Sequence, residues 1–416
     1  MLRSFGIFFP PSLAIRVGVL GLACFNHSAY AQNDNLEHQG KWSYQLSTDA
    51  WYLNTSANRD DVPGFVEQST NLFLPNSKTQ WRFKNTSLSG WVIGQQSLTQ
   101  DTELSLKAQV GQTLGMRVDE AQILKNISPS FGLRAGVVDY KTSWCRTYES
   151  DNAWMREIEA ICNTPQFRDV TGGAPGVQLF MHKMVKDYLV QGQIGYYDPL
   201  LFGYATKEFG NLLPSPRFEV QSNKKYGFNV NALDTYTGVE ARLSFIHTVQ
   251  SGYLPEADLR GQFKQKSNLV YAGLNMPLTE RLRSRITNTR QIQKAACHSD
   301  VAHIGSSCNL NLNQEKTSTS IELTYLWDAK NTISTGFSKL HMDTYQQVFT
   351  PSADIYAEAS PTQIASQQTA TAWRHEWTAN VFTVVQYISS QQKTFSAMQP
   401  FPSHGYAVGF RLGYQF

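Results

Sequence analysis

The sequence predicts an all-β protein: a transmembrane antiparallel up-and-down β-barrel of about 16 strands, with a range of about 14 to 18. One observation is the stretch 404–416, where aromatic or aliphatic residues take every second position and small or polar residues fill the gaps. Another is that short and mostly long connections alternate along the chain, as in barrels whose turns share one side of a membrane. The strand count is also even, which puts both termini on the short-turn side.

An export signal precedes the predicted barrel. Arg3 and Arg16 come before an apolar run at 17–25, and Ala29 and Ala31 complete a cleavage site of the secretory type. We therefore expect 1–31 to be a removed signal peptide and 32–416 to form one domain in the bacterial outer membrane. Cys24 leaves a lipid anchor open as an alternative.

The charge balance argues against a nucleic-acid partner. The chain has 36 basic and 33 acidic residues, and removal of Arg3 and Arg16 with the signal leaves 34 against 33. A nucleic-acid-binding surface needs a clustered basic excess. The mature chain also lacks a run of about 18 uncharged apolar residues, the length that a membrane-spanning helix requires.

Sixteen segments alternate between apolar and polar residues and are separated by turn signals. They cover residues 41–53, 79–93, 102–112, 119–126, 131–137, 176–182, 188–197, 226–233, 239–245, 267–276, 280–292, 316–327, 332–341, 369–374, 381–390 and 404–416.

The early segments show the alternation most clearly at 102–112. Leu104 and Leu106 share one face there, while Ser105 and Lys107 share the other. Segment 119–126 is weaker, and it turns at Ser128-Pro129-Ser130 into 131–137. Charges on one face are expected in a soluble β-sandwich with a solvent-exposed face as well as in an aqueous lumen. This pattern alone therefore does not separate a soluble sheet from a membrane barrel.

The middle segments form hairpins with short turns. Residues 176–182 and 188–197 are joined by Val185-Lys186-Asp187. In 226–233, Tyr226, Phe228 and Val230 lie on one face. A turn at 235–238 then leads into 239–245, as expected for neighbouring antiparallel strands.

The late segments complete the count. Residues 316–327 carry an apolar face, and Asp328-Ala329-Lys330-Asn331 turns the chain into 332–341. Segments 267–276 and 369–374 are short and weakly patterned, whereas 381–390 and 404–416 alternate regularly.

Basic residues share the face opposite the apolar one on several of these segments. On 280–292, Arg281, Arg283 and Arg285 stand at successive same-face positions about 7 Å apart. On a lipid face each would cost about 2 to 4 kcal/mol, so an aqueous lumen suits them better. A solvated rim without selectivity is the simpler alternative. The predicted basic wall of the pore comprises Arg82, Lys84, Arg134, Arg242, Arg281, Arg283 and Arg285. Lys107 and Arg411 share that face.

The long segment 139–174 and the cysteines are the other candidate features. A connection of this length is usually functional or disordered. It carries Cys145 and Cys162, while Cys297 and Cys308 lie in a later predicted loop. Four cysteines in an exported chain suggest two disulfides, and closeness in sequence favours Cys145 with Cys162 and Cys297 with Cys308 over the crossed pairings.

The chain resembles the sixteen-stranded general porins of Gram-negative outer membranes in its signal peptide, its aromatic final strand and its alternating connections. The resemblance implies a channel for passive diffusion of small hydrophilic solutes or ions, with 139–174 folded into the lumen as a constriction loop. The acids of that loop would be Glu149, Asp151, Glu157 and Glu159. Phe416 would be the residue recognised by the outer-membrane assembly machinery, and facing arginines would give a weak anion preference.

The chain also departs from that family. The segment 113–118 is too short for the loop that braces general-porin trimers, which puts a homotrimer in doubt, and general porins normally lack loop cysteines. An external lid is therefore the alternative for 139–174.

A metal site, an enzyme and a plugged barrel are the alternatives to a channel. A metal site at Cys297, His298, His303 and Cys308 matches no standard zinc spacing, and no cofactor motif is present. An enzyme is not expected, because the histidines are scattered and no serine lies in a nucleophile motif. A surface-exposed barrel with a plugged lumen, acting as an adhesin or binding protein, stays open as an alternative function.

Overall fold

A computed structural model describes residues 41–55, 87–111, 115–139, 173–200, 219–253, 261–299, 310–349, 355–395 and 400–415. The strands are β1 (Lys41–Thr55), β2 (Ser87–Thr99), β3 (Thr102–Gly111), β4 (Gly115–Ser128), β5 (Phe131–Asp139), β6 (Gly173–Val185), β7 (Tyr188–Tyr197), β8 (Glu219–Asp234), β9 (Glu240–Tyr253), β10 (Gly261–Pro277), β11 (Leu282–Ser299), β12 (Leu310–Leu326), β13 (Asn331–Phe349), β14 (Ile355–Glu376), β15 (Val381–Phe395) and β16 (Pro400–Gln415). Within these ranges, no helix is long and apolar enough to cross a membrane.

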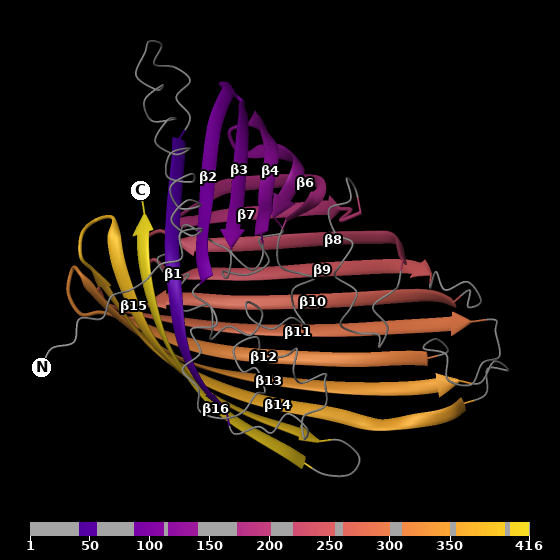
Figure 1. Cartoon of the computed structure of the whole chain (residues 1–416). Coiled ribbons are helices and arrows are strands. Elements are labelled where there is room, and N and C mark those ends of the chain that lie inside the picture. The colour runs from indigo at the N-terminus through magenta and orange to yellow at the C-terminus, as the bar shows by residue number, and fades with distance from the viewer. Residues whose placement is uncertain are drawn as a thin grey trace, which may run out of the picture.

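The strands form one closed antiparallel barrel in which each strand pairs with its neighbours in sequence. β1 closes the barrel by pairing with both β2 and β16, with Leu46 opposite Tyr414. Figure 1 shows β8 to β14 side by side, with β1 to β3 running at a steep angle to them. The prediction of an all-β up-and-down barrel is confirmed, and the described part of the chain contains sixteen strands.

Every predicted strand overlaps an observed one, but several observed strands are longer on the side away from the short turns. β14 begins at Ile355, where only 369–374 was predicted, and β11 continues to Ser299 beyond the predicted 280–292. These extensions have polar residues on both faces, so apolar alternation could not reveal them. The predicted start of the second strand, 79–86, lies outside the described residues.

The two faces of the wall differ in chemistry. On β8, Tyr226, Phe228 and Val230 are exposed on the outer face, whereas Lys225 and Asn229, at alternate positions, are buried on the inner face. The same alternation runs through β9 to β12, where inner-wall serine, threonine and glutamine side chains are buried. An apolar outside and a polar inside are the reverse of a soluble sheet's core and are typical of a transmembrane barrel.

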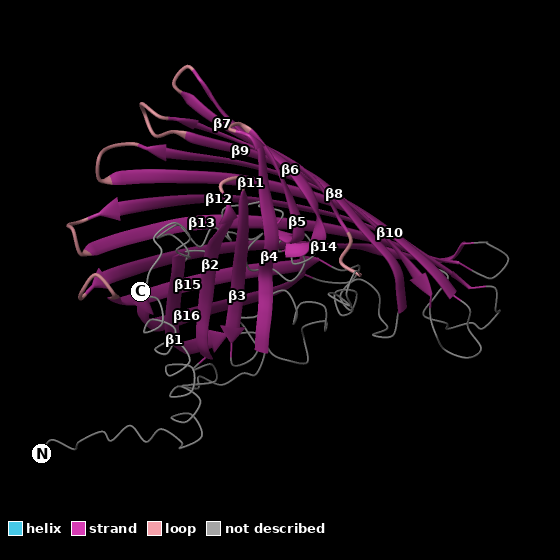
Figure 2. Cartoon of the chain, turned by 90° about the horizontal axis from the view of Figure 1, so that it is seen from above, coloured by secondary structure: helices cyan, strands magenta, loops and turns pink. Residues whose placement is uncertain are grey.

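The shortest connections lie together at one end of the barrel (Figure 2). They include residues 100–101, 129–130 and 186–187. The turn between β12 and β13 is held by Asp328, whose carboxylate accepts hydrogen bonds from the backbone N–H groups of Lys330 (2.7 Å) and Asn331 (2.8 Å). These bonds, the one from Lys330 first, lower the pKa of Asp328 below its ordinary value of 3.8. Such a carboxylate stabilises the turn above pH 3.8 and loses that effect as the pH falls through its lower folded pKa.

Candidate functional site: an arginine ring on the inner wall

Five arginines occupy the inner face near the short-turn end, and we name them the arginine ring. They are Arg134 on β5, Arg242 on β9, Arg285 on β11, Arg374 on β14 and Arg411 on β16. Their inward direction follows from the alternation, since Leu133, Leu243 and Ile286 beside three of them are exposed on the outside.

The five arginines lie at similar distances from the short-turn end. Arg242 is the third residue of β9, while Arg134 and Arg285 are the fourth residues of β5 and β11. Arg374 stands two residues before the end of β14, and Arg411 stands four residues before the end of β16. Because the short turns mark one end of the barrel, the guanidinium groups encircle the lumen near that end.

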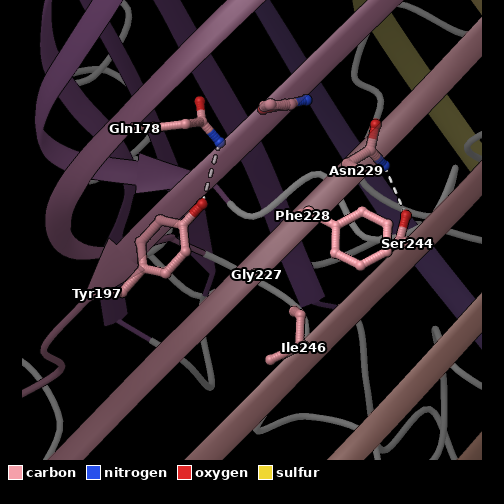
Figure 3. A pocket seen from close by; sticks show the side chains of 8 residues that line it. Gln178, Tyr197, Gly227, Phe228, Asn229, Ser244 and Ile246 are labelled. Carbon is pink, nitrogen blue, oxygen red and sulfur yellow. Dashed lines mark hydrogen bonds between the residues drawn. The ribbon is translucent and has the colours of Figure 1, made fainter.

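Arg134 is held mainly by neutral groups. Its Nη1 donates to Gln178 Oε1 at 3.0 Å, and the guanidinium carbon lies 4.5 Å from the centre of the Phe180 ring. Gln178 in turn donates from Nε2 to the hydroxyl of Tyr197 at 3.0 Å (Figure 3). Because no carboxylate hydrogen-bonds this guanidinium among the described residues, its positive charge is not neutralised by direct contact.

A small pocket lies beside this network on β6 to β9. Figure 3 shows Gln178 and Tyr197 on one side of it and Asn229 and Ser244 on the other. Asn229 Nδ2 donates to Ser244 Oγ at 2.6 Å. The wall here is polar and partly hydrogen-bonded to itself, while the buried Gln193 Oε1 has no hydrogen-bond partner among the described residues.

Three other arginines of the ring each face a carboxylate. Arg285 Nη2 pairs with Glu322 Oε2 on β12. Arg242 Nη2 lies 3.6 Å from Glu240, and Arg374 Nη2 lies 3.1 Å from Glu376. These pairs fix the guanidinium groups against the wall and reduce the net positive field that they create. By register, Arg411 lies opposite Asp49.

Two arginines of the ring share a packing arrangement of arginine, phenylalanine and glycine. Arg134 stacks on Phe180, which lies opposite Gly132 in the sheet. Arg374 stacks at 4.4 Å on Phe382, which lies opposite Gly413. Since glycine has no Cβ, each ring can lie over the neighbouring backbone and present its face to a cation.

The structure places the remaining predicted wall residues differently. Arg281 lies in the turn before β11 rather than within a strand, and Arg283 is exposed near the end of the barrel. Neither forms an ion pair with a described residue, whereas Arg285 does. Arg82 and Lys84 lie outside the described residues.

Sequence reasoning missed three buried inner-wall cations. Arg374 was treated as the end of a strand, although β14 continues to Glu376. Lys225 directly precedes the predicted segment 226–233, and Lys316 is the first residue of the predicted segment 316–327; neither was predicted as a wall cation, and both are buried on the inner face. Lys316 donates to Gln293 Oε1 at 2.8 Å. The register places Lys316 opposite Gln291, Lys225 opposite Tyr197 and Arg374 opposite Thr332, so the paired residues share no signal that the sequence could have given.

The predicted loop acids and most cysteines are not described. Glu149, Asp151, Glu157, Glu159, Cys145, Cys162, Cys308 and Phe416 all lie outside the described residues. Cys297 was predicted in a loop, but it lies within β11, because that strand extends to Ser299. It is buried and disulfide-bonded, and its pairing with Cys308 stays a prediction. No group of three metal-ligating side chains occurs in the described part of the chain.

The closed barrel, its apolar outer face and its polar inner wall define the porin type of outer-membrane β-barrel fold. Among solved structures, an anion-selective porin from Comamonas acidovorans matches with a TM-score of 0.50 and 10% identity, covering 91% of this chain and all (100%) of that one. The outer-membrane expressed OmpT of Vibrio cholerae matches with a TM-score of 0.50 and 9% identity, covering 92% of this chain and 99% of that one. No protein-family model and no curated protein matches the sequence. At these identities the likeness concerns the fold.

Proposed function

We propose that this protein is a channel of the bacterial outer membrane that lets small hydrophilic solutes or ions diffuse passively, with a weak preference for anions. The observation that carries the proposal is the arginine ring on the inner wall of a closed barrel whose outer face is apolar. A barrel of about 16 strands is wide enough to leave an aqueous passage. The signal peptide 1–31 accounts for export in this proposal.

The ring accounts for a weak rather than a strong selectivity. Arg242, Arg285 and Arg374 each have a carboxylate neighbour, so they create local dipoles across the wall. Arg134 is bound to neutral groups and keeps its charge towards the lumen. Rings of arginine or lysine side chains favour anions in pores. Arg283 and Arg281 add exposed positive charge at the same end.

The segment 139–174 is proposed as the constriction. Four of its six acids, Glu149, Asp151, Glu157 and Glu159, would then face the arginine ring across the passage and create a transverse field, which orients dipolar solutes. A homotrimer is the oligomeric state suggested by the general-porin resemblance, and chemical cross-linking in outer-membrane fragments would test it.

The test of selectivity reverses the charges of Arg281 and Arg283, which form no ion pair with a described residue. Arg281→Glu combined with Arg283→Glu should move the zero-current potential in a planar bilayer under a salt gradient towards cation preference. These side chains are exposed and unpaired among described residues, so folding should be little affected. Lys339→Glu with Lys393→Glu reverses the same number of charges on exposed strand positions of β13 and β15 and is the matched control.

An unchanged potential in the first variant would remove the short-turn arginines from the proposed pore. A shift of equal size in the control would show that selectivity follows overall charge instead. Migration as a heat-modifiable band on gels establishes that each variant is folded before it is measured.

The alternative is a barrel with a covered lumen that acts as a surface binding protein. One observation favours it: on β8, β11 and β12 the inner-wall residues Lys225, Gln291 and Lys316 are only 2%, 0% and 2% exposed. A fully open passage would leave such side chains wet. Insertion into a bilayer without any single-channel steps would support this alternative over the channel.

A further inference from the structure

Lysines gather on the outer face of β8, β10 and β11, beyond the apolar band. We name Lys224, Lys264, Lys266 and Lys294 the lysine row. Lys266 lies directly opposite Lys294, and both Lys266 and Lys224 lie opposite Val249 of β9. Neighbouring strands are about 4.8 Å apart. Lys224, Lys266 and Lys294 therefore lie on one line across β8 to β11 that is about 15 Å long. All four side chains are exposed.

Among the described residues, no acid lies directly opposite a lysine of the row. None of the four lysines forms an ion pair there, although Arg290 on the same outer face of β11 pairs with Glu315 at 2.8 Å. Two like charges directly opposite each other in a sheet destabilise it. Lys266 and Lys294 therefore form a site whose repulsion an external anion would relieve.

The side chains next to the row on its short-turn side indicate its depth in the membrane. The next outward positions towards the short turns are Tyr226, His247 and Asn268, in which Tyr226 stacks on His247 at 6.4 Å and His247 Nδ1 lies 2.6 Å from Asn268 Oδ1. The position after that holds Phe228 and Phe245, with ring centres 5.8 Å apart. Aromatic residues with polar partners mark the interface between hydrocarbon and headgroups.

The height of the row agrees with this order. Lys266 stands eleven residues before Pro277, the last residue of β10. At about 3.4 Å per residue and a tilt of about 40°, this is about 29 Å above the short-turn end. An apolar band about 25 Å tall ends just below that level. The row therefore lies where lipid headgroups of the leaflet on the long-connection side surround the barrel.

We propose that the lysine row binds the phosphate groups of anionic lipid headgroups in that leaflet. Ammonium groups about 5 and 10 Å apart suit a headgroup with more than one phosphate, or two neighbouring headgroups, and phosphates are strong acceptors for lysine. The proposal rests on the membrane placement proposed above, but not on conduction.

The test measures lipid retention by the full-length, folded protein. Delipidated protein in neutral detergent is incubated with bisphosphorylated lipid A or with phosphatidylcholine, and the bound lipid is counted by native mass spectrometry. The wild type should retain lipid A in preference to phosphatidylcholine. Lys266→Gln with Lys294→Gln should weaken lipid A binding about 25-fold, about fivefold for each lysine removed near a charged surface.

Two controls separate this proposal from others. Lys186→Gln with Lys330→Gln removes the same number of charges from exposed positions in two short turns, at the other end of the barrel, and should leave lipid A binding within about twofold of wild type. Excess inorganic phosphate should not displace the lipid, because the lipid is also held by the apolar band. Equal loss in both variants, no preference over phosphatidylcholine, or displacement by free phosphate would each overturn the proposal.

The same preparations, reconstituted for conductance, distinguish the two proposals. Conduction without lipid preference removes the lysine row as a lipid site and leaves the channel intact. Lipid A retention without conduction supports the lysine row as a lipid site and contradicts the channel. Failure to insert into vesicles would contradict the membrane placement on which both rest.

Discussion

Gly132 and Gly413 determine where two phenylalanine rings of the inner wall can lie. A Cβ on Gly132 would overlap the tip of Phe180 and stand 2.7 Å from the carbonyl oxygen of Lys125. At Gly413 the overlap would be with Phe382. Arg134 and Arg374 stack on these two phenylalanine side chains. The two glycines therefore determine indirectly where two of the five guanidinium groups lie. Glycine here is required for space, not for an unusual backbone conformation.

Gly132→Ala should therefore destabilise the barrel by about 1 to 3 kcal/mol, the usual cost of overpacking. It should also change ion selectivity, because Arg134 must move with Phe180. Gly192→Ala is the control, since its new methyl group would meet only the flexible end of Met181 at 3.3 Å. The urea midpoint of unfolding and the zero-current potential measure the two effects, and equal midpoints for both variants would contradict this account.

At the level of the strand, the outer face changes character along its length. On β12, Ile321 and Leu323 are exposed apolar residues near the short turn, whereas Asn313 is an exposed polar residue further along the same face. The apolar part of this face contacts the hydrocarbon tails of the lipids and must stay apolar, while the polar part lies outside them and has no such requirement. The position of the change defines how deep each strand sits in the membrane.

Ile321→Arg should consequently cost about 2 to 4 kcal/mol, because it buries a charge in the apolar band. Asn313→Arg, eight residues away on the same face of β12, should cost less than about 1 kcal/mol. Unfolding from vesicles by urea gives both values. Similar costs at the two positions would mean that the band has been placed wrongly.

The same difference explains what sequence could predict. The strand at 188–197 was predicted with the bounds that β7 has, because both of its ends are marked by turns or by loss of alternation. β14 was predicted over only 369–374, because its first half carries polar residues such as Gln363 and Gln367 on the outward side. Arg285 was predicted on the lumen face, but its partner Glu322 was not, since pairing depends on a register that alternation leaves undetermined.

For the whole molecule, closure depends on the last strand meeting the first. β16 pairs with β15 on one side and β1 on the other, so the barrel cannot close until the C-terminus is in place. Its exposed outer residues Val408, Phe410, Leu412 and Tyr414 lead up to Phe416, which lies outside the described residues. Tyr414, the last of these described residues, thus lies at the seam between β1 and β15, opposite Leu46 and Val381.

Deletion of Phe416 should impair assembly in the outer membrane and leave export across the inner membrane intact. Cell fractionation with heat-modifiability on gels measures the two steps separately, and unfolded protein should collect in the periplasm and be degraded. Replacement of Phe416 by Tyr keeps an aromatic terminus and should assemble normally. A normal amount of folded barrel after the deletion would show that the final aromatic residue is dispensable.

The length of β10 to β14 affects which positions of the sequence can vary during evolution. β14 has 22 residues, whereas about 9 to 11 are enough to cross a bilayer. The remainder stands outside the hydrocarbon, where inward side chains such as Ile364 are still buried but outward side chains face neither lipid tails nor a core. Outside the lysine row, the outward positions of these extensions are therefore where substitutions should accumulate most freely, and where molecules that recognise the cell surface would meet the most variable part of the chain.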